Sequence, residues 1–397
     1  MTTVMKTKKV WQTVGAVAVA SLAFWGGTFV GSGSDPASTA ANITAGPVPQ
    51  ASLLPSPPVT QYERRDPELG TRAGVSPMDE LPDNVRALTD FGQRPHWSPD
   101  GSKIAFVNAE DAAVGDVWTV DVNTGATRNL TGHLGGLGFT RANYLSNGDL
   151  LLCGPASAPV PPVDNPETGR FTGVLFVLRA PFEKQPQALG VPCWEGIATS
   201  RTSLQIAWNH SNADFTDPAD APRWISEIWV GELRYEGDHV TVIGTRKVID
   251  HEVFDSKVLL EVQDFRPLAE TELILTAYGY QGIAEVLALD LTTGGVRNLS
   301  SSSAYEEAEN VAPDGEAVYV ERDFVHEGDT AGEIDIWRLD LTDSSWQRMT
   351  MFNRYAPHYA SNPTVSPDGR WLAYQLSYNG EIEGQGLGIL LQPLDHK

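Results

Sequence analysis

The chain has few basic residues and few cysteines for its length. It contains 28 Lys and Arg against 51 Asp and Glu in 397 residues, so its net charge is −23 at pH 7. Binding to a phosphate backbone needs a surplus of Lys and Arg, so this balance argues against a nucleic acid as partner. The two cysteines, Cys153 and Cys193, do not form a CxxC motif. Outside the cytoplasm they could form one disulfide bond.

The motifs of several enzyme classes are also absent. No GxSxG segment is present to place a serine nucleophile on a sharp turn. Neither GxGxxG nor a P-loop occurs, so no nucleotide cofactor is expected. The histidines lack the short spacing that is typical of metal ligands. We therefore expect a protein without a cofactor and without a bound metal.

Beyond the N-terminus, no segment is apolar over the length needed to span a bilayer. Lys6, Lys8 and Lys9 precede the apolar residues 14–24, and small residues follow. This pattern predicts that residues 1–31 form a signal peptide, or a signal-anchor if they are not cleaved. The protein is then secreted or held in the cell envelope, and it contacts a membrane only through an uncleaved N-terminal segment. Residues 32–78 are rich in Ala, Ser and Pro and predict a linker.

Two apolar strand patterns alternate through the rest of the chain, and each recurs six times. Turns of the type Ser-Pro-Asp-Gly precede several strands of the first pattern, as at residues 98–101 and 366–369. Proline fixes one backbone angle of such a turn, and Asp-Gly closes a hairpin. The repeated strands lie at 102–107 and 116–122, 149–154 and 173–180, 203–208 and 227–233, 272–277 and 285–291, 316–321 and 335–341, and 370–375 and 388–394. They predict an all-β chain with a six-bladed β-propeller over residues 79–397.

The last repeat lacks a fourth strand after residues 388–394. The segment NVRALT at residues 84–89 has the pattern of the other fourth strands and precedes the first blade. We expect this N-terminal strand to pair beside residues 388–394 and complete blade six. Such pairing closes the ring and covers a sheet edge that would otherwise be open.

The segments WSPDGSKIAFV and VSPDGRWLAYQ resemble the PD40 repeats of TolB-type six-bladed propellers. The resemblance covers the chain from residue 84 onward and implies the same fold. It leaves the function open, because propellers of this type serve as interaction platforms, enzymes and accessory domains.

The first strand of each blade should line the central channel. The six candidate strands, aligned on their last apolar residue, bring acidic and basic side chains to one mouth of the channel. We predict carboxyl groups for catalysis and basic or polar groups for substrate binding. The catalytic candidates are Glu307, Glu309, Glu195 and Glu261, and the binding candidates are Arg94, Arg141, His96 and Asn362.

Two carboxyl groups with separated pKa values are the groups that cleave a glycosidic bond. An arginine beside them can bind a carboxylate through two parallel hydrogen bonds. Together they would suit a sugar that carries a uronic acid. In the alternative interpretation, Arg–Glu pairs between adjacent blades only hold the channel together.

The C-terminal half resembles the fungal saponin hydrolases, which are propeller glycosidases. The similar segments include AYGYQG at 277–282, YEEAENVAPDG at 305–315 and ASNPTVSPDGRWLAYQ at 360–375. The resemblance covers residues 261–394 and implies removal of a glucuronide-linked sugar from triterpenoid saponins. It also implies that Glu307 and Glu309 are the first carboxylates to test, with Glu321 and Asp323 next.

Two functions are therefore compatible with the sequence. The first is a secreted, TolB-like propeller that hydrolyses or binds a uronic-acid-bearing glycoside, with a glycoside or another small molecule at its axis. The second is a non-catalytic interaction propeller of the cell envelope, with a protein as partner.

Overall fold

The computed structural model describes most of the chain after residue 48. The described residues are 49–56, 72, 75–108, 115–134, 138–155, 173–211, 225–255, 257–281, 283–323, 334–355, 357–378 and 385–394. The predicted signal segment, residues 1–31, and most of the predicted linker lie outside them. The described residues form strands β1 to β25 and contain no α-helix. Among them, no helix is suited to crossing a membrane.

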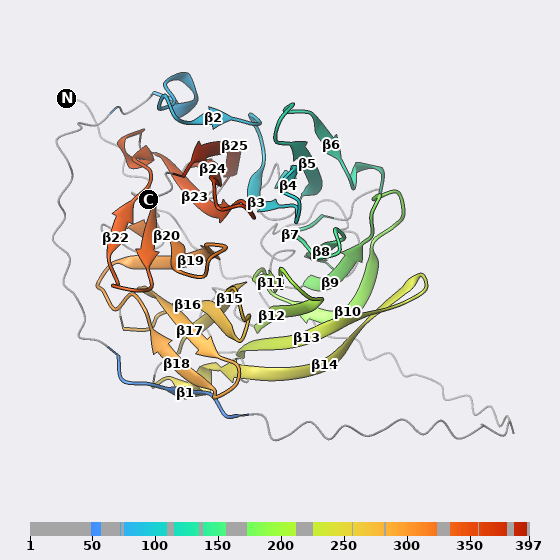
Figure 1. Ribbon diagram of the computed structural model, residues 1–397, viewed down its shortest axis with the longest axis vertical. Helices are drawn as coiled ribbons and strands as arrows, with labels where there is room; N and C mark the ends of the chain where they lie inside the picture. Colours follow the sequence, from blue (N-terminus) through green and yellow to red (C-terminus); the bar gives the residue numbers. More distant parts are fainter. Residues whose placement is uncertain are drawn as a thin grey trace, which may run out of the picture. The chain divides into compact units, whose positions relative to one another are not determined.

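Six antiparallel four-stranded blades surround a common centre (Figure 1). Four blades are separate sheets, whereas the fourth and fifth are joined by one parallel pair, Ala284 with Tyr305, into a nine-stranded sheet that also contains β1 (Ser52–Leu53). In each blade the first strand lies nearest the centre and the fourth lies outside it. Blade one consists of β3 (Gln93–Trp97), β4 (Lys103–Asn108), β5 (Asp116–Asp121) and β6 (Thr127–Asn129). Blade two consists of β7 (Arg141–Tyr144), β8 (Leu150–Pro155), β9 (Gly173–Leu178) and β10 (Gln187–Cys193). Blade three consists of β11 (Ile197–Thr199), β12 (Gln205–Ser211), β13 (Ser226–Glu236) and β14 (His239–Asp250).

The remaining three blades follow the same order. Blade four consists of β15 (Leu259–Phe265), β16 (Glu272–Tyr278), β17 (Ala284–Asp290) and β18 (Gly295–Asn298). Blade five consists of β19 (Tyr305–Val311), β20 (Ala317–Asp323), β21 (Asp335–Asp340) and β22 (Trp346–Arg348). Blade six consists of β23 (His358–Val365), β24 (Trp371–Tyr378), β25 (Gln385–Pro393) and β2 (Arg86–Ala87). The predicted six-bladed propeller is confirmed by this strand order.

The ring closes through the N-terminal strand, as the sequence predicts. Strand β2 pairs antiparallel with β25, so Arg86 lies opposite Leu391 and Ala87 opposite Leu390. On either side of this strand, Val85 and Leu88 are buried in separate apolar cores. The pairing therefore joins the two ends of the propeller and buries apolar side chains at the seam.

Repeated side-chain hydrogen bonds explain the repeated sequence motifs of the outer strands. In blade one, the Thr131 hydroxyl donates to Asp116 at 3.0 Å and accepts the Val117 N–H at 2.8 Å. In blade five, Thr350 donates to Asp335 at 2.6 Å and accepts from the Ile336 N–H at 2.9 Å. The acidic residue that starts the third strand thus fixes the end of the fourth.

One strand was not foreseen in the linker. Strand β1 (Ser52–Leu53) pairs in parallel with β18, with Ser52 opposite Gly295. It gives blade four an additional outermost strand. The Leu53 side chain packs against the apolar core of blades three and four, which explains why this short segment is held there.

The two cysteines lie within blade two, Cys153 on β8 and Cys193 at the end of β10. Their Sγ atoms are bonded, and their Cα atoms are 6.1 Å apart. Gly173 on β9 lies between them, and a Cβ there would come within 2.9 Å of one Sγ and 3.1 Å of the other. The glycine therefore leaves the space that the disulfide occupies.

Candidate functional site

The innermost strands of the blades carry unusual backbone at the level of the predicted site. Strands β3, β15, β19 and β23 each contain a register shift near their middle. Arg94, Glu195 and Asn362 adopt left-handed backbone, with φ of 55°, 51° and 48°. This conformation is uncommon for residues other than glycine and concentrates at functional sites. All three residues are among the predicted site residues, although no sequence signal indicates their backbone conformation.

Polar side chains on the second strands support these irregular segments. The Arg94 N–H donates to Gln375 at 2.7 Å, and the Asn362 N–H donates to Glu321 at 2.6 Å. Each acceptor belongs to the blade before the one that it supports. The arrangement recurs twice. The Val262 N–H donates to the Asn209 side chain at 2.7 Å, and the Ala308 N–H donates to the Thr276 hydroxyl at 3.0 Å. Neighbouring blades are therefore tied together at the level of the site.

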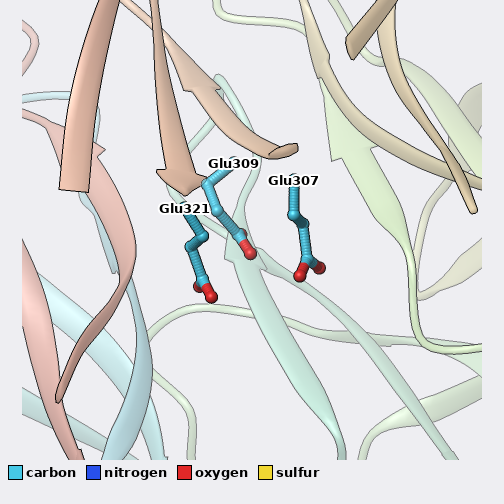
Figure 2. Close-up of side chains that lie close together, drawn as sticks. All are labelled: Glu307, Glu309 and Glu321. Atoms are coloured by element: carbon cyan, nitrogen blue, oxygen red, sulfur yellow. The ribbon is translucent and has the colours of Figure 1, made fainter. Parts of the chain in front are cut away.

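Five glutamates gather at this level of the axis: Glu195, Glu261, Glu307, Glu309 and Glu321. Figure 2 shows the side chains of Glu307, Glu309 and Glu321 with their carboxyl groups close together. One carboxylate oxygen from each of these three lies within 4.8 Å of the other two. Glu307 is half-buried, whereas Glu195, Glu261, Glu309 and Glu321 are buried. Glu307 is thus the carboxyl group of the cluster that is most open to a ligand.

The two predicted arginines cross the channel. Arg94 of blade one forms an ion pair with Glu195 of blade three. Arg141 of blade two lies 3.1 Å from Glu261 of blade four and 3.8 Å from Glu309 of blade five. The alternative interpretation of the sequence placed such pairs between adjacent blades. These pairs instead join blades that are not adjacent, so the side chains fill the centre of the ring.

Two tyrosines that sequence analysis did not select complete the cluster. The Tyr278 hydroxyl lies 2.8 Å from Glu261 and 2.5 Å from Glu307. The Tyr305 hydroxyl also bonds to Glu307. Tyr278 ends β16 and Tyr305 begins β19, so neither belongs to the aligned row of inner-strand positions. Both tyrosines lie in segments that carry the saponin-hydrolase resemblance. That resemblance was the one sequence feature that could have pointed to them.

Burial raises the pKa of several of these carboxyl groups. Burial, followed by repulsion from Glu195, raises the pKa of Glu261 to about 7. Burial and the neighbouring Glu321 raise the pKa of Glu307 to about 7 as well. Burial raises the pKa of Glu309 well above its ordinary value of 4.5. Near neutral pH the cluster therefore contains both protonated and ionised carboxyl groups.

Arg141 remains charged in this setting. Burial alone would lower the pKa of Arg141, but the carboxylates of Glu309, Glu261 and Glu195 raise it above the ordinary value. A cation held in a buried site forms strong hydrogen bonds to carboxylates.

A small cavity lies on the axis beside the cluster. His96, Arg141, Gln263, Glu309 and Asn362 are among its lining residues. Its volume is about 30 Å³, which is room for one or two water molecules. The His96 Nδ1 accepts the Tyr144 N–H at 3.1 Å, and burial, followed by Arg201, lowers the pKa of His96 to about 4. His96 is therefore a neutral group that links blades one and two.

The structure thus places the predicted residues in one region. Glu261, Glu307, Glu309, Arg141 and Asn362 belong to one hydrogen-bonded network with Tyr278. Arg94 with Glu195 forms a second pair, and His96 lines the cavity. The network also contains Glu321 through Asn362, whose side-chain amide is 2.8 Å from it. Asp323 is buried opposite Tyr305 in the pairing of β19 with β20.

No family model and no curated protein matches the chain. Several solved structures are similar to it in fold. TolB from Acinetobacter baumannii is 14% identical, with a TM-score of 0.31, over 79% of this chain and 55% of TolB. The propeller domain of the Trilobed protease from Pyrococcus furiosus is 14% identical, with a TM-score of 0.40, over 77% and 84%. The gluconolactonase XC5397 from Xanthomonas campestris is 14% identical, with a TM-score of 0.48, over 78% and 89%.

The chain thus spans about half the length of that TolB. Because the identities and TM-scores are low, these similarities carry no argument about function. The propeller assignment rests on the strand pairing described above.

Proposed function

We propose that the chain is a glycoside hydrolase that acts outside the cytoplasm on glycosides carrying a uronic acid. One observation carries the proposal. Glu261 and Glu307 share the Tyr278 hydroxyl, and the pKa of each is raised to about 7. A pair of this kind holds one proton near neutral pH, so it offers an acid and an ionised carboxylate together.

The surroundings assign different roles to the two groups. Arg141 lies 3.1 Å from Glu261 and favours its ionised form, which is the form of a nucleophile. Glu307 lies between the hydroxyls of Tyr278 and Tyr305 and is the more exposed group. In the proposed reaction Glu307 donates its proton to the glycosidic oxygen while Glu261 attacks the anomeric carbon. Water then releases the sugar from Glu261, with Glu307 accepting a proton from that water.

The spacing favours retention of the anomeric configuration. Both carboxylates contact one hydroxyl oxygen, at 2.8 and 2.5 Å, so the two contacting oxygens are at most about 5.3 Å apart. Retaining enzymes hold their two carboxyl groups about 5–5.5 Å apart, whereas inverting enzymes leave room for a water between them.

The arginines support the choice of a uronic acid. In the free protein, Arg94 and Arg141 are bound to carboxylates of the site itself. A sugar carboxylate presents the same group and would take the place of Glu195 beside Arg94. The resemblance of residues 261–394 to saponin hydrolases agrees with this substrate class. The predicted export segment and the disulfide support a location outside the cytoplasm.

The proposal is tested by turnover of glycosides with and without the uronic acid. Purified protein is assayed on matched 4-nitrophenyl glucuronides and glucosides of both anomers, and on a saponin glucuronide. We expect release from a glucuronide, and a loss of at least a hundredfold in kcat for Glu307→Gln and for Glu261→Gln. Glu285→Gln is the matched control, because this carboxyl is also buried with a pKa of about 7 but hydrogen-bonds Ser300.

Full activity in Glu307→Gln would refute the assigned roles. An absence of turnover on every glycoside, together with a protein partner recovered by pull-down, would favour the interaction propeller instead.

A further inference from the structure

Two residues that line the axial cavity each carry a buried hydrogen-bond donor that has no acceptor. Within the described residues, Gln263 Nε2 and Arg141 Nε are buried and have no hydrogen-bond partner. Both residues line the cavity, and Gln263 is only 8% exposed. A buried donor without a partner costs about 1–3 kcal/mol, so such groups usually meet a bound ligand or water.

His96 lines the same cavity as a neutral group. Its Nδ1 lies 3.1 Å from the Tyr144 N–H nitrogen and 3.2 Å from the Trp97 carbonyl oxygen. His96 stays neutral because it is buried and because the cations of Arg201 and Arg141 are near.

The two acidic residues in the lining do not oppose an anion. Asp264 accepts from both terminal nitrogens of Arg201, at 3.1 and 2.7 Å. It also accepts from the Asn310 amide at 2.8 Å and from the Val311 N–H at 2.9 Å. Glu309 lies 3.8 Å from Arg141, and burial raises its pKa well above 4.5, which reduces its negative charge. Arg94 and Arg141, the two cations of the lining, pair with Glu195 and Glu261 through their terminal nitrogens, which leaves Arg141 Nε for a further acceptor.

From these contacts we infer that the axial cavity is a binding site for one small anion, held by Gln263 Nε2 and Arg141 Nε. The volume of about 30 Å³ admits a monatomic anion such as chloride, or the carboxylate group of a larger ligand. The two sources share the same chemistry, which is a compact negative charge that accepts two N–H donors. Arg141 then contacts the carboxylate cluster through its terminal nitrogens and the anion through Nε.

The site is tested by direct binding to the full chain in low-salt buffer. Chloride is followed by the line width of its chlorine-35 NMR signal, and acetate and D-glucuronate by titration calorimetry with D-glucose as the uncharged comparison. We expect at least one of the anions to bind with a stoichiometry of one per chain and glucose not to compete with it. Gln263→Glu places a negative charge in the cavity and should weaken that binding at least tenfold.

Gln347→Glu on the exposed face of β22 adds the same charge far from the axis and should leave anion binding unchanged. If Gln263→Glu does not fold, Gln263→Leu removes the donor without adding charge and should also weaken binding. Chloride binding alone identifies a structural ion, and carboxylate binding identifies part of a ligand; both support the inference.

The inference is overturned if no anion binds, or if binding is equally tight in the Gln263 variants. Water would then fill the cavity. Because binding is measured without turnover, this result is independent of whether the chain hydrolyses glycosides.

Discussion

The carboxyl group of Glu307 should make the stability of the protein depend on pH in a predictable direction. Burial and the charge of Glu321 raise its pKa from 4.5 to about 7 in the folded protein. Between these values the folded state holds a proton that the unfolded state releases. The contribution of Glu307 to stability is therefore fully present below pH 4.5 and is lost as the pH rises through 7.

The size of the effect follows from the two pKa values. A change from 4.5 to about 7 corresponds to about 3 kcal/mol in the free energy of unfolding. Glu307→Gln keeps the shape of the side chain and its contacts with Tyr278 and Tyr305, but it removes the ionisable group. As the pH rises from 4.5 to 8.5, the free energy of unfolding of the variant should therefore increase by about 3 kcal/mol relative to that of the wild type.

Urea unfolding at these two pH values measures the difference. Glu316→Gln is the control, because its carboxyl is exposed and lies in the hairpin that joins β19 to β20. We expect the difference between Glu316→Gln and the wild type to stay nearly constant. The reasoning is wrong if Glu307→Gln shows the same stability difference at both pH values, or if the wild type gains on the variant as the pH rises.

Two further predictions concern the closure of the ring and the disulfide. Leu88→Ala removes a buried side chain at the seam and should lower the free energy of unfolding by about 2–5 kcal/mol, whereas Leu54→Ala, at an exposed position, should change it by less than about 0.5 kcal/mol. Equal effects in a urea titration would argue against the seam. Replacing Cys153 and Cys193 by alanine removes a crosslink between residues 40 apart and should cost about 4 kcal/mol, and dithiothreitol should bring the wild type to the same stability. A wild type that is unaffected by reduction would contradict this.

The fold could be predicted because it is encoded by short-range patterns that repeat. The Ser-Pro-Asp-Gly turn forms from its own residues: the Asp100 carboxylate accepts from the Ser98 hydroxyl at 2.7 Å and the Ser102 N–H at 3.0 Å. Gly101 adopts φ of 70°, a conformation open to glycine. The repeats also showed that the last blade lacks a fourth strand and that the segment at residues 84–89 could supply it. Strand β2 occupies that position beside β25.

The candidate site was predictable only as a row of side chains. The positions of Glu261, Glu307 and Arg141 along their strands indicated one end of the channel. Their partners depend on distances across the ring, which the sequence does not contain. The pairing of Arg141 with Glu261 of blade four rather than a neighbouring blade is the clearest example.

Other features left almost no trace in the sequence. Tyr278 reaches the site from the end of a second strand, so a search of inner-strand positions misses it. The left-handed backbone of Arg94 is supported by Gln375 from the last blade, 281 residues away in the chain. Strand β1 is held by packing against blade four and has too few residues to show a strand period.

The most direct test of the proposed mechanism is to trap the sugar on the enzyme. A 2-deoxy-2-fluoroglucuronide with a good leaving group slows the second step of a retaining glycosidase, so that the covalent intermediate accumulates. We expect mass spectrometry of the digested protein to find the added sugar on Glu261, and to find none in Glu261→Gln. Turnover of glucuronides without an adduct, an adduct on a residue outside the axial cluster, or no reaction at all would contradict the proposal.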